Sequence, residues 1–64
     1  MTLGERMIRV RAKLRLSQSE LAKLLDTYPQ AINRIENEKG KLHKANEFRL
    51  SEALATIEAR EGIL

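Results

Sequence analysis

The chain has 64 residues, no cysteine and a formal net charge of +3. This length supports one small domain with a marginal core, and the lack of cysteine excludes disulfides and thiolate metal sites. No apolar run is long enough to span a membrane or to serve a signal peptide, so we expect a soluble, cytoplasmic protein. One proline and three glycines leave few turn signals, which favours an all-α fold.

The charge is unevenly distributed along the chain. Residues 1–15 contain five basic residues and one glutamate, a net charge of +4, whereas residues 46–64 carry a net charge of −2. If the protein meets a polyanion, the last third of the chain is therefore expected on the far side. Charge alone fits equally well a protein with solvated helix faces and no polyanionic partner.

The first predicted helix covers residues 2–14. Its apolar residues recur at spacings of four, three and four, which places them on one helix face. They are Leu3, Met7, Val10 and Leu14. Thr2 and Glu5 form a T-x-x-E capping box at its start, and Ile8 lies off the apolar stripe, either exposed or covered by a partner.

Two short helices are predicted over residues 18–25 and 29–37. A second capping box, Ser17 with Glu20, opens the first of them. Pro29 suits the first turn of the second, because its missing N–H would be unpaired there anyway. The inward-facing residues are Leu21, Leu24, Leu25, Ile32 and Ile35. A connection of about three residues is the length found in a helix-turn-helix unit.

The last predicted segment, residues 45–60, follows a basic loop and forms one helix or two short ones. Its apolar positions are Phe48, Leu50, Ala53, Leu54 and Ile57. Phe48 and Leu50 cannot lie on one narrow face, so we expect this helix to be buried on more than one side. The whole chain, residues 1–64, is then a single domain, a compact all-α bundle of four to five helices containing a helix-turn-helix.

Four stretches carry a resemblance to a known family: LGERM at 3–7, LSQSELAKLL at 16–25, AINRIENEKGK at 31–41 and LSEAL at 50–54. With them the chain resembles the lambda-repressor-like, or Xre-type, helix-turn-helix family, which includes phage repressors and Cro proteins. The resemblance implies a small Cro-like or repressor-like transcriptional regulator that binds double-stranded DNA in a sequence-specific way. Family members mostly bind palindromic operators as dimers, with half-sites about one helical turn, ~34 Å, apart.

The resemblance also implies which residues contact bases, because the second helix of the pair enters the major groove by its first turn. The implied base-contacting residues are Pro29, Gln30, Ala31, Asn33 and Arg34. The Gln30 amide suits adenine N6 and N7, and the Ala31 methyl can meet a thymine methyl. Arg34 can reach guanine or a phosphate, and Asn33 can do likewise.

Phosphate contacts are expected from a second set of residues around this helix. They are Gln18, Tyr28, Asn37, Lys39, Lys41, His43 and Lys44. By the resemblance, Gln18 bonds a phosphate and braces the recognition helix, although it is also a good first-turn residue in its own right. The alternative for the basic loop, EKGKLHK at 38–44, is a solvated loop that makes no phosphate contact. The family further implies a structural ion pair between Arg11 and Glu36.

Two positions depart from the family pattern, and both concern turns. Asp26 stands where the turn often has glycine, and Arg15 stands where glycine or asparagine is common. Asp tolerates the left-handed backbone conformation better than most residues. Arg15 adds a positive charge, but its backbone is expected to be strained in that conformation.

A dimer contact is expected from apolar residues in the acidic last third, namely Leu54, Ile57, Ile63 and Leu64. Alternatively, these residues complete the core of the monomer, and the dimer is weak without DNA. A different function on the same fold is a protein-interaction module such as an antitoxin, for which Ile8 and the terminal Ile63 and Leu64 are hints. One histidine and no paired carboxylates argue against an enzyme, and nothing points to a cofactor, a metal or a small-molecule ligand.

Overall fold

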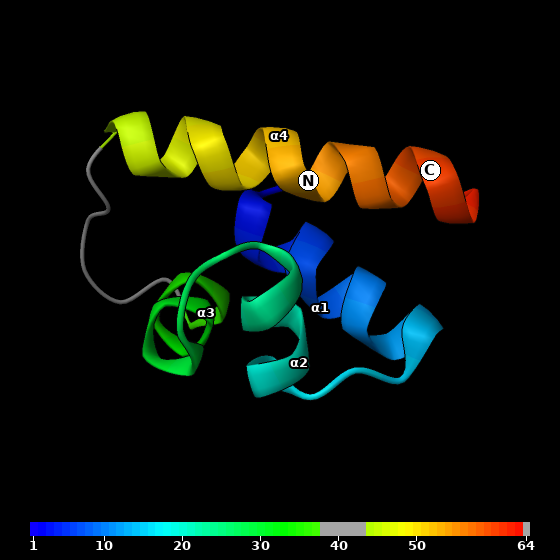
Figure 1. The fold of residues 1–64 in the computed structure, drawn as a ribbon, viewed down its shortest axis with the longest axis horizontal. Helices are drawn as coiled ribbons and strands as arrows, with labels where there is room; N and C mark the ends of the chain where they lie inside the picture. Colours follow the sequence, from blue (N-terminus) through cyan, green and yellow to red (C-terminus); the bar gives the residue numbers. More distant parts are fainter. Residues whose placement is uncertain (38–43, 64) are drawn as a thin grey trace.

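The computed structural model describes residues 1–37 and 44–63. Their elements are α1 (Leu3–Leu14), α2 (Gln18–Leu24), α3 (Pro29–Glu36) and α4 (Lys44–Glu61). This part of the chain is all-α, as predicted. In Figure 1, α4 lies along one side of the molecule, α1 runs beneath it, and α2 and α3 lie on the side away from α4. None of these helices is long and apolar enough to cross a membrane.

The starts of α1 and α2 are set by the two predicted capping boxes. The Thr2 hydroxyl accepts a hydrogen bond from the Glu5 N–H at 3.1 Å, and the Glu5 carboxylate accepts one from the Thr2 N–H at 2.8 Å. Ser17 and Glu20 repeat the arrangement at 3.0 and 2.8 Å. Each box satisfies backbone donors that have no partner within the helix, so it fixes where the helix begins.

The connections on either side of α2 both use a left-handed residue. Arg15, which follows α1, has φ 56°, and Asp26, in the turn after α2, has φ 55°. At the first connection the Leu16 N–H bonds the Arg11 carbonyl at 2.9 Å, which closes the end of α1. Both positions therefore adopt the conformation for which glycine is the usual choice, as their place in the motif predicted.

The core draws on all four described helices. Its fully buried large side chains are Met7, Val10, Leu21, Leu25, Ile32, Leu50 and Leu54. Leu3, Leu14, Leu16, Ile35 and Ala53 are partly buried and pack around this group. Because aliphatic side chains supply nearly all of this core, its stability depends on close packing rather than on aromatic contacts.

Two predictions about burial were wrong. Leu24, expected inside, is 56% exposed, because Leu21 and Leu25 occupy the buried face of α2. Phe48 is 67% exposed. Phe48 lies about 200° around the helix from the buried Leu50. The helix α4 is continuous and packs on the molecule through a single face, not on more than one side as expected. The outer face of α4 is therefore not buried within the monomer.

Candidate nucleic-acid interface

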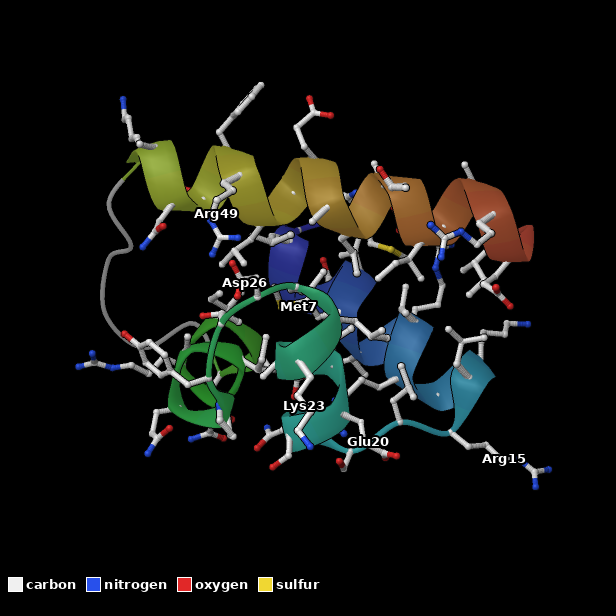
Figure 2. The ribbon with its side chains drawn as sticks, in the orientation of Figure 1. Met7, Arg15, Glu20, Lys23, Asp26 and Arg49 are labelled. Atoms are coloured by element: carbon white, nitrogen blue, oxygen red, sulfur yellow. The ribbon has the colours of Figure 1, made fainter. Side chains whose placement is uncertain are left out.

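The helices α2 and α3 form a helix-turn-helix unit whose turn is held in two ways. Within the unit, the Thr27 N–H bonds the Ala22 carbonyl at 2.8 Å. From outside it, Arg49 of α4 donates hydrogen bonds to the carbonyls of Leu25 at 2.9 Å and Asp26 at 3.2 Å. Figure 2 shows Arg49 pointing from α4 toward this turn. The angle between the two helices is thus supported by a side chain of α4.

The helix α3 presents a polar row on its outer surface. Pro29 occupies its first turn, and Tyr28 before it has extended backbone, makes no side-chain capping bond and is 64% exposed. Ile32 is fully buried and anchors the helix on the core. The exposed polar residues of the helix and its C-cap are Gln30, Asn33, Arg34 and Asn37. The inner face of this short helix is therefore anchored on the core, and its outer face is polar and exposed to solvent.

An ion pair joins α1 to the C-terminal end of α3. Arg11 Nη2 lies 2.6 Å from Glu36 Oε1, and Arg11 Nε lies 2.8 Å from Oε2, so the pair is bidentate. The Glu36 side chain is only 6% exposed. Burial alone would raise the pKa of Glu36, but hydrogen bonds from Arg11 and Gln18 outweigh it and lower this pKa below its ordinary value.

Gln18 connects this ion pair to the surface of α3. Its Nε2 donates to Glu36 Oε1 at 3.1 Å and to Asn33 Oδ1 at 3.3 Å. An amide nitrogen has two hydrogens, so both are engaged within the protein. Gln18 braces α3 as the sequence implied, whereas a phosphate contact through the same NH₂ group would require one of these bonds to break.

The sequence model of the helix-turn-helix family matches residues 7–61. The chain belongs to this family. Its type is the Xre, or lambda-repressor-like, helix-turn-helix, whose members are DNA-binding regulators. No curated protein and no solved structure matches the chain significantly. With the family established, α3 takes the place of the recognition helix of a helix-turn-helix protein.

One of the base-contacting residues expected on this recognition helix has a different position. Ala31 is 8% exposed, because it lies on the inner side of α3 next to the buried Ile32. Its methyl group therefore has little exposed surface with which to contact a thymine methyl, and the burial of Ala31 argues against the expected base contact. Pro29 is half-buried, while Gln30, Asn33 and Arg34 are exposed on the outer side.

The expected phosphate-contacting residues are described only in part. Tyr28 and Asn37 flank α3 and are exposed, and Lys44 begins α4 and is exposed. The Asn37 amide donates hydrogen bonds to the backbone and side-chain oxygens of Asn33 at 2.7 and 2.8 Å. The predictions for Lys39, Lys41 and His43 lie outside the described residues.

The dimer contact predicted from apolar residues of the last third was wrong for three of its four members. Leu54 is fully buried, and Ile57 and Ile63 are 9% and 6% exposed. All three belong to the core cluster of the monomer, because the inner face of α4 packs on α1. Leu64 lies outside the described residues.

A second ion-pair cluster, between α1 and α4, was not anticipated from the sequence. Arg6 lies 2.6 Å from Glu58 and donates to the Ser51 hydroxyl at 2.8 Å, while Arg9 lies 3.5 Å from Glu58. Hydrogen bonds from Arg6 lower the pKa of Glu58, whose side chain is 9% exposed. The only sequence signal was the pair of arginines three residues apart on α1, which does not reveal a partner 52 residues away.

Gly4, in the LGERM stretch of the family motif, lies where α1 closely approaches the end of α3. A Cβ atom at this position would lie 2.5 Å from the Ile35 carbonyl oxygen and 3.2 Å from the Glu36 Cα. No real Cβ contact is as short as the first of these. Gly4 therefore permits the close approach of α1 to the end of the recognition helix.

We also searched the described residues for a metal site and for a surface hollow. Within residues 1–37 and 44–63, no group of three His, Cys, Asp or Glu residues is placed to hold a metal ion. An open hollow lies between the second half of α1 and the end of α4, lined by Arg9, Lys13, Leu14, Glu61, Gly62 and Ile63. It contains none of the residues expected to contact DNA.

Proposed function

We propose that the protein is a sequence-specific transcriptional regulator that places α3 in the major groove of double-stranded DNA. The observation that carries the proposal is the polar row of Gln30, Asn33 and Arg34 on a helix anchored from behind. Side chains of a recognition helix read base edges only if the helix is held at a fixed angle to the groove. Buried Ile32 and the Arg11–Glu36 pair provide that support.

The residues of the row divide into base readers and positioning contacts. Gln30, in the first turn, pairs with adenine through N6 and N7, and Arg34, one turn on, donates to guanine or to a phosphate. Tyr28 and Lys44 flank the helix and contact phosphates, which fixes the register of the protein on the duplex. The Asn37 NH₂ group donates both of its hydrogens to Asn33, so Asn37 reaches a phosphate only if one of these bonds breaks. Base readers and positioning contacts are both needed, because phosphate contacts supply affinity that carries no sequence information.

The regulator binds a palindromic operator as a dimer whose half-sites lie about one helical turn, ~34 Å, apart. The exclusion of Leu54, Ile57 and Ile63 from the surface supports a dimer that forms mainly on the operator through other residues. One observation favours a second function on the same fold. Phe48 and Ile8 are 67% and 47% exposed, and large exposed apolar side chains suit a regulator or antitoxin that binds a partner protein.

Selection of bound sequences from a random duplex pool tests the proposal, with the wild type, Gln30→Ala and Thr56→Ala as a control on α4. The wild type and the control are expected to return the same inverted repeat. Gln30→Ala is expected to lose preference at one symmetric base pair, a change of roughly 1–3 kcal/mol at that pair. Absence of any motif, with binding that disappears uniformly as salt rises, would contradict the proposal.

A further inference from the structure

A chain of hydrogen bonds runs from the interior to the outer surface of α3. Arg11 bonds the Glu36 carboxylate at 2.6 Å, and this carboxylate accepts from Gln18 Nε2 at 3.1 Å. Gln18 Nε2 also donates to Asn33 Oδ1 at 3.3 Å. From the other side, Asn37 Nδ2 donates to the same Asn33 Oδ1 at 2.8 Å.

The two ends of this chain fix which way each amide faces. A Glu36 carboxylate paired with arginine only accepts hydrogen bonds, so the Gln18 group that faces it is the NH₂. Asn37 is fixed independently, because its NH₂ also donates to the Asn33 backbone carbonyl at 2.7 Å, and a carbonyl only accepts. Both neighbours therefore offer donors to the Asn33 side chain.

It follows that the Asn33 amide has one orientation. Its Oδ1 receives two hydrogen bonds, which fill both lone pairs, and the oxygen faces back into the protein. Its NH₂ group is the part left for a ligand, and Asn33 itself is exposed. An amide in this state cannot accept a hydrogen bond from outside unless an internal bond breaks.

We propose that Asn33 meets DNA only as a hydrogen-bond donor. It then binds an acceptor, either a base edge (guanine O6 or N7, adenine N7, thymine O4) or a phosphate oxygen, and does not make the bidentate pair with adenine. That pair needs the amide oxygen to accept from adenine N6, and this oxygen is occupied. The inference rests on the proposed function, and it assigns Asn33 a recognition chemistry different from that of Gln30.

The test repeats the sequence selection with Asn33→Ala and measures the affinity for the selected duplex and for a scrambled one. If a base is the acceptor, Asn33→Ala loses a base preference at one symmetric pair, with a loss of about tenfold in affinity, and any adenine preference at that pair survives replacement of the adenine by purine, which retains N7. If a phosphate is the acceptor, the variant binds both duplexes more weakly by the same factor and keeps its base preferences. Both results support the inference and distinguish the two sources of the acceptor.

Two results would overturn it. The first is an adenine preference that depends on residue 33 and falls when that adenine is replaced by purine, which lacks the N6 amino donor. The second is an Asn33→Ala protein with wild-type affinity and preferences. Residue 33 is exposed, so the variant is expected to keep the thermal unfolding midpoint within a few degrees, which is measured alongside.

Gln18→Ala supplies a second, independent readout. Loss of Gln18 frees one lone pair on Asn33, so the variant is expected to tolerate adenine at the pair read by residue 33, or to bind uniformly more weakly in the phosphate case. Unchanged preference and affinity would count against the inference. Gln30→Ala separates this failure from a failure of the proposed function. If Gln30→Ala alters the motif while Asn33→Ala and Gln18→Ala change neither the motif nor the affinity, only the inference fails. Both the inference and the proposed function fail if the wild type returns no motif.

Discussion

Two polar clusters of similar chemistry join α1 to its neighbours, and they differ in where they lead. The recognition-side cluster comprises Arg11, Glu36 and Gln18. The α4-side cluster comprises Arg6, Glu58 and Ser51, with Arg9 at its edge, 3.5 Å from Glu58. Each has a bidentate arginine–carboxylate pair with a closest distance of 2.6 Å, and the carboxylate side chains are 6% and 9% exposed.

The difference lies in the third member of each cluster. Ser51 and its backbone carbonyl both accept from Arg6, so they complete the α4-side cluster within the α1–α4 contact. Gln18 instead donates a hydrogen bond to Asn33, which lies in the exposed polar row of α3, and so connects the recognition-side cluster to that row. We therefore expect damage to the α4-side cluster to reduce stability alone, and damage to the recognition-side cluster to reduce stability and alter DNA recognition.

The largest expected effect is the loss of an arginine from the recognition-side cluster. Arg11→Met leaves the Glu36 charge with only the Gln18 amide, and breaking a buried pair in this way costs about 3 kcal/mol of unfolding free energy. Arg6→Met is expected to cost less, about 2 kcal/mol, because Arg9 remains 3.5 Å from Glu58. Urea unfolding measures both, and a larger cost for Arg6→Met would contradict this ranking.

The next effect concerns the close approach of α1 to α3. Gly4→Ala brings a Cβ within 2.5 Å of the Ile35 carbonyl, and backbone must move to accept it, at a cost of about 2 kcal/mol. Gly62→Ala is the matched control, since it has open space but a left-handed φ of 69°, which costs roughly 1 kcal/mol. Thermal unfolding would show the difference, and an equal cost for both variants would mean that α1 and α3 are not in tight contact.

Acid should weaken both clusters. The folded pKa values of Glu36 and Glu58 are depressed. Their contribution to stability is therefore present above the ordinary Glu pKa, about 4.3, and is lost as pH falls through the lower folded values. The thermal unfolding midpoint of the wild type is expected to fall as the pH is lowered from 5 to 3. Glu58→Gln should lose less stability over the same range, and an equal drop in both proteins would show that Glu58 does not contribute.

The smallest effects are expected at the two left-handed residues, and they are gains. Arg15→Gly and Asp26→Gly should each raise the unfolding free energy by roughly 0.5–1 kcal/mol, because glycine removes the Cβ strain but adds disorder to the unfolded chain. The gain should be larger at Arg15, since Asp tolerates this conformation better. Chemical denaturation compares them, and a loss of stability at Arg15 would show that its side chain makes a stabilising contact.

Sequence reasoning located the first three helices well because their signals are local. Capping boxes at Thr2 and Ser17 and the proline at 29 each mark a helix start within a few residues, independently of the rest of the fold. The periodicity of α4 identified its apolar positions but did not determine whether they pack in the monomer core or against a second copy of the chain. Leu54 and Ile57 were therefore open to two interpretations, and only the packing of α4 on α1 decided between them.

The candidate site was predictable as a set of residues but not as an arrangement. The family motif indicated the outer row of α3 and the Arg11–Glu36 pair, and it implied a base contact for Ala31, which is only 8% exposed. The Arg6–Glu58 contact joins residues 52 apart, so it depends on how α4 crosses α1. The orientation of the Asn33 amide depends on four other side chains on three helices and their boundaries, which no sequence pattern encodes.

The most direct test of the account compares the neutral members of the two clusters. We would measure the ratio of affinities for the selected operator and a scrambled duplex, for the wild type, Gln18→Ala and Ser51→Ala. Ser51→Ala is expected to keep the wild-type ratio despite some loss of stability, whereas Gln18→Ala should change either the ratio or both affinities. Equal behaviour of the two variants toward DNA would contradict the claim that only the recognition-side cluster leads to the proposed DNA-binding surface.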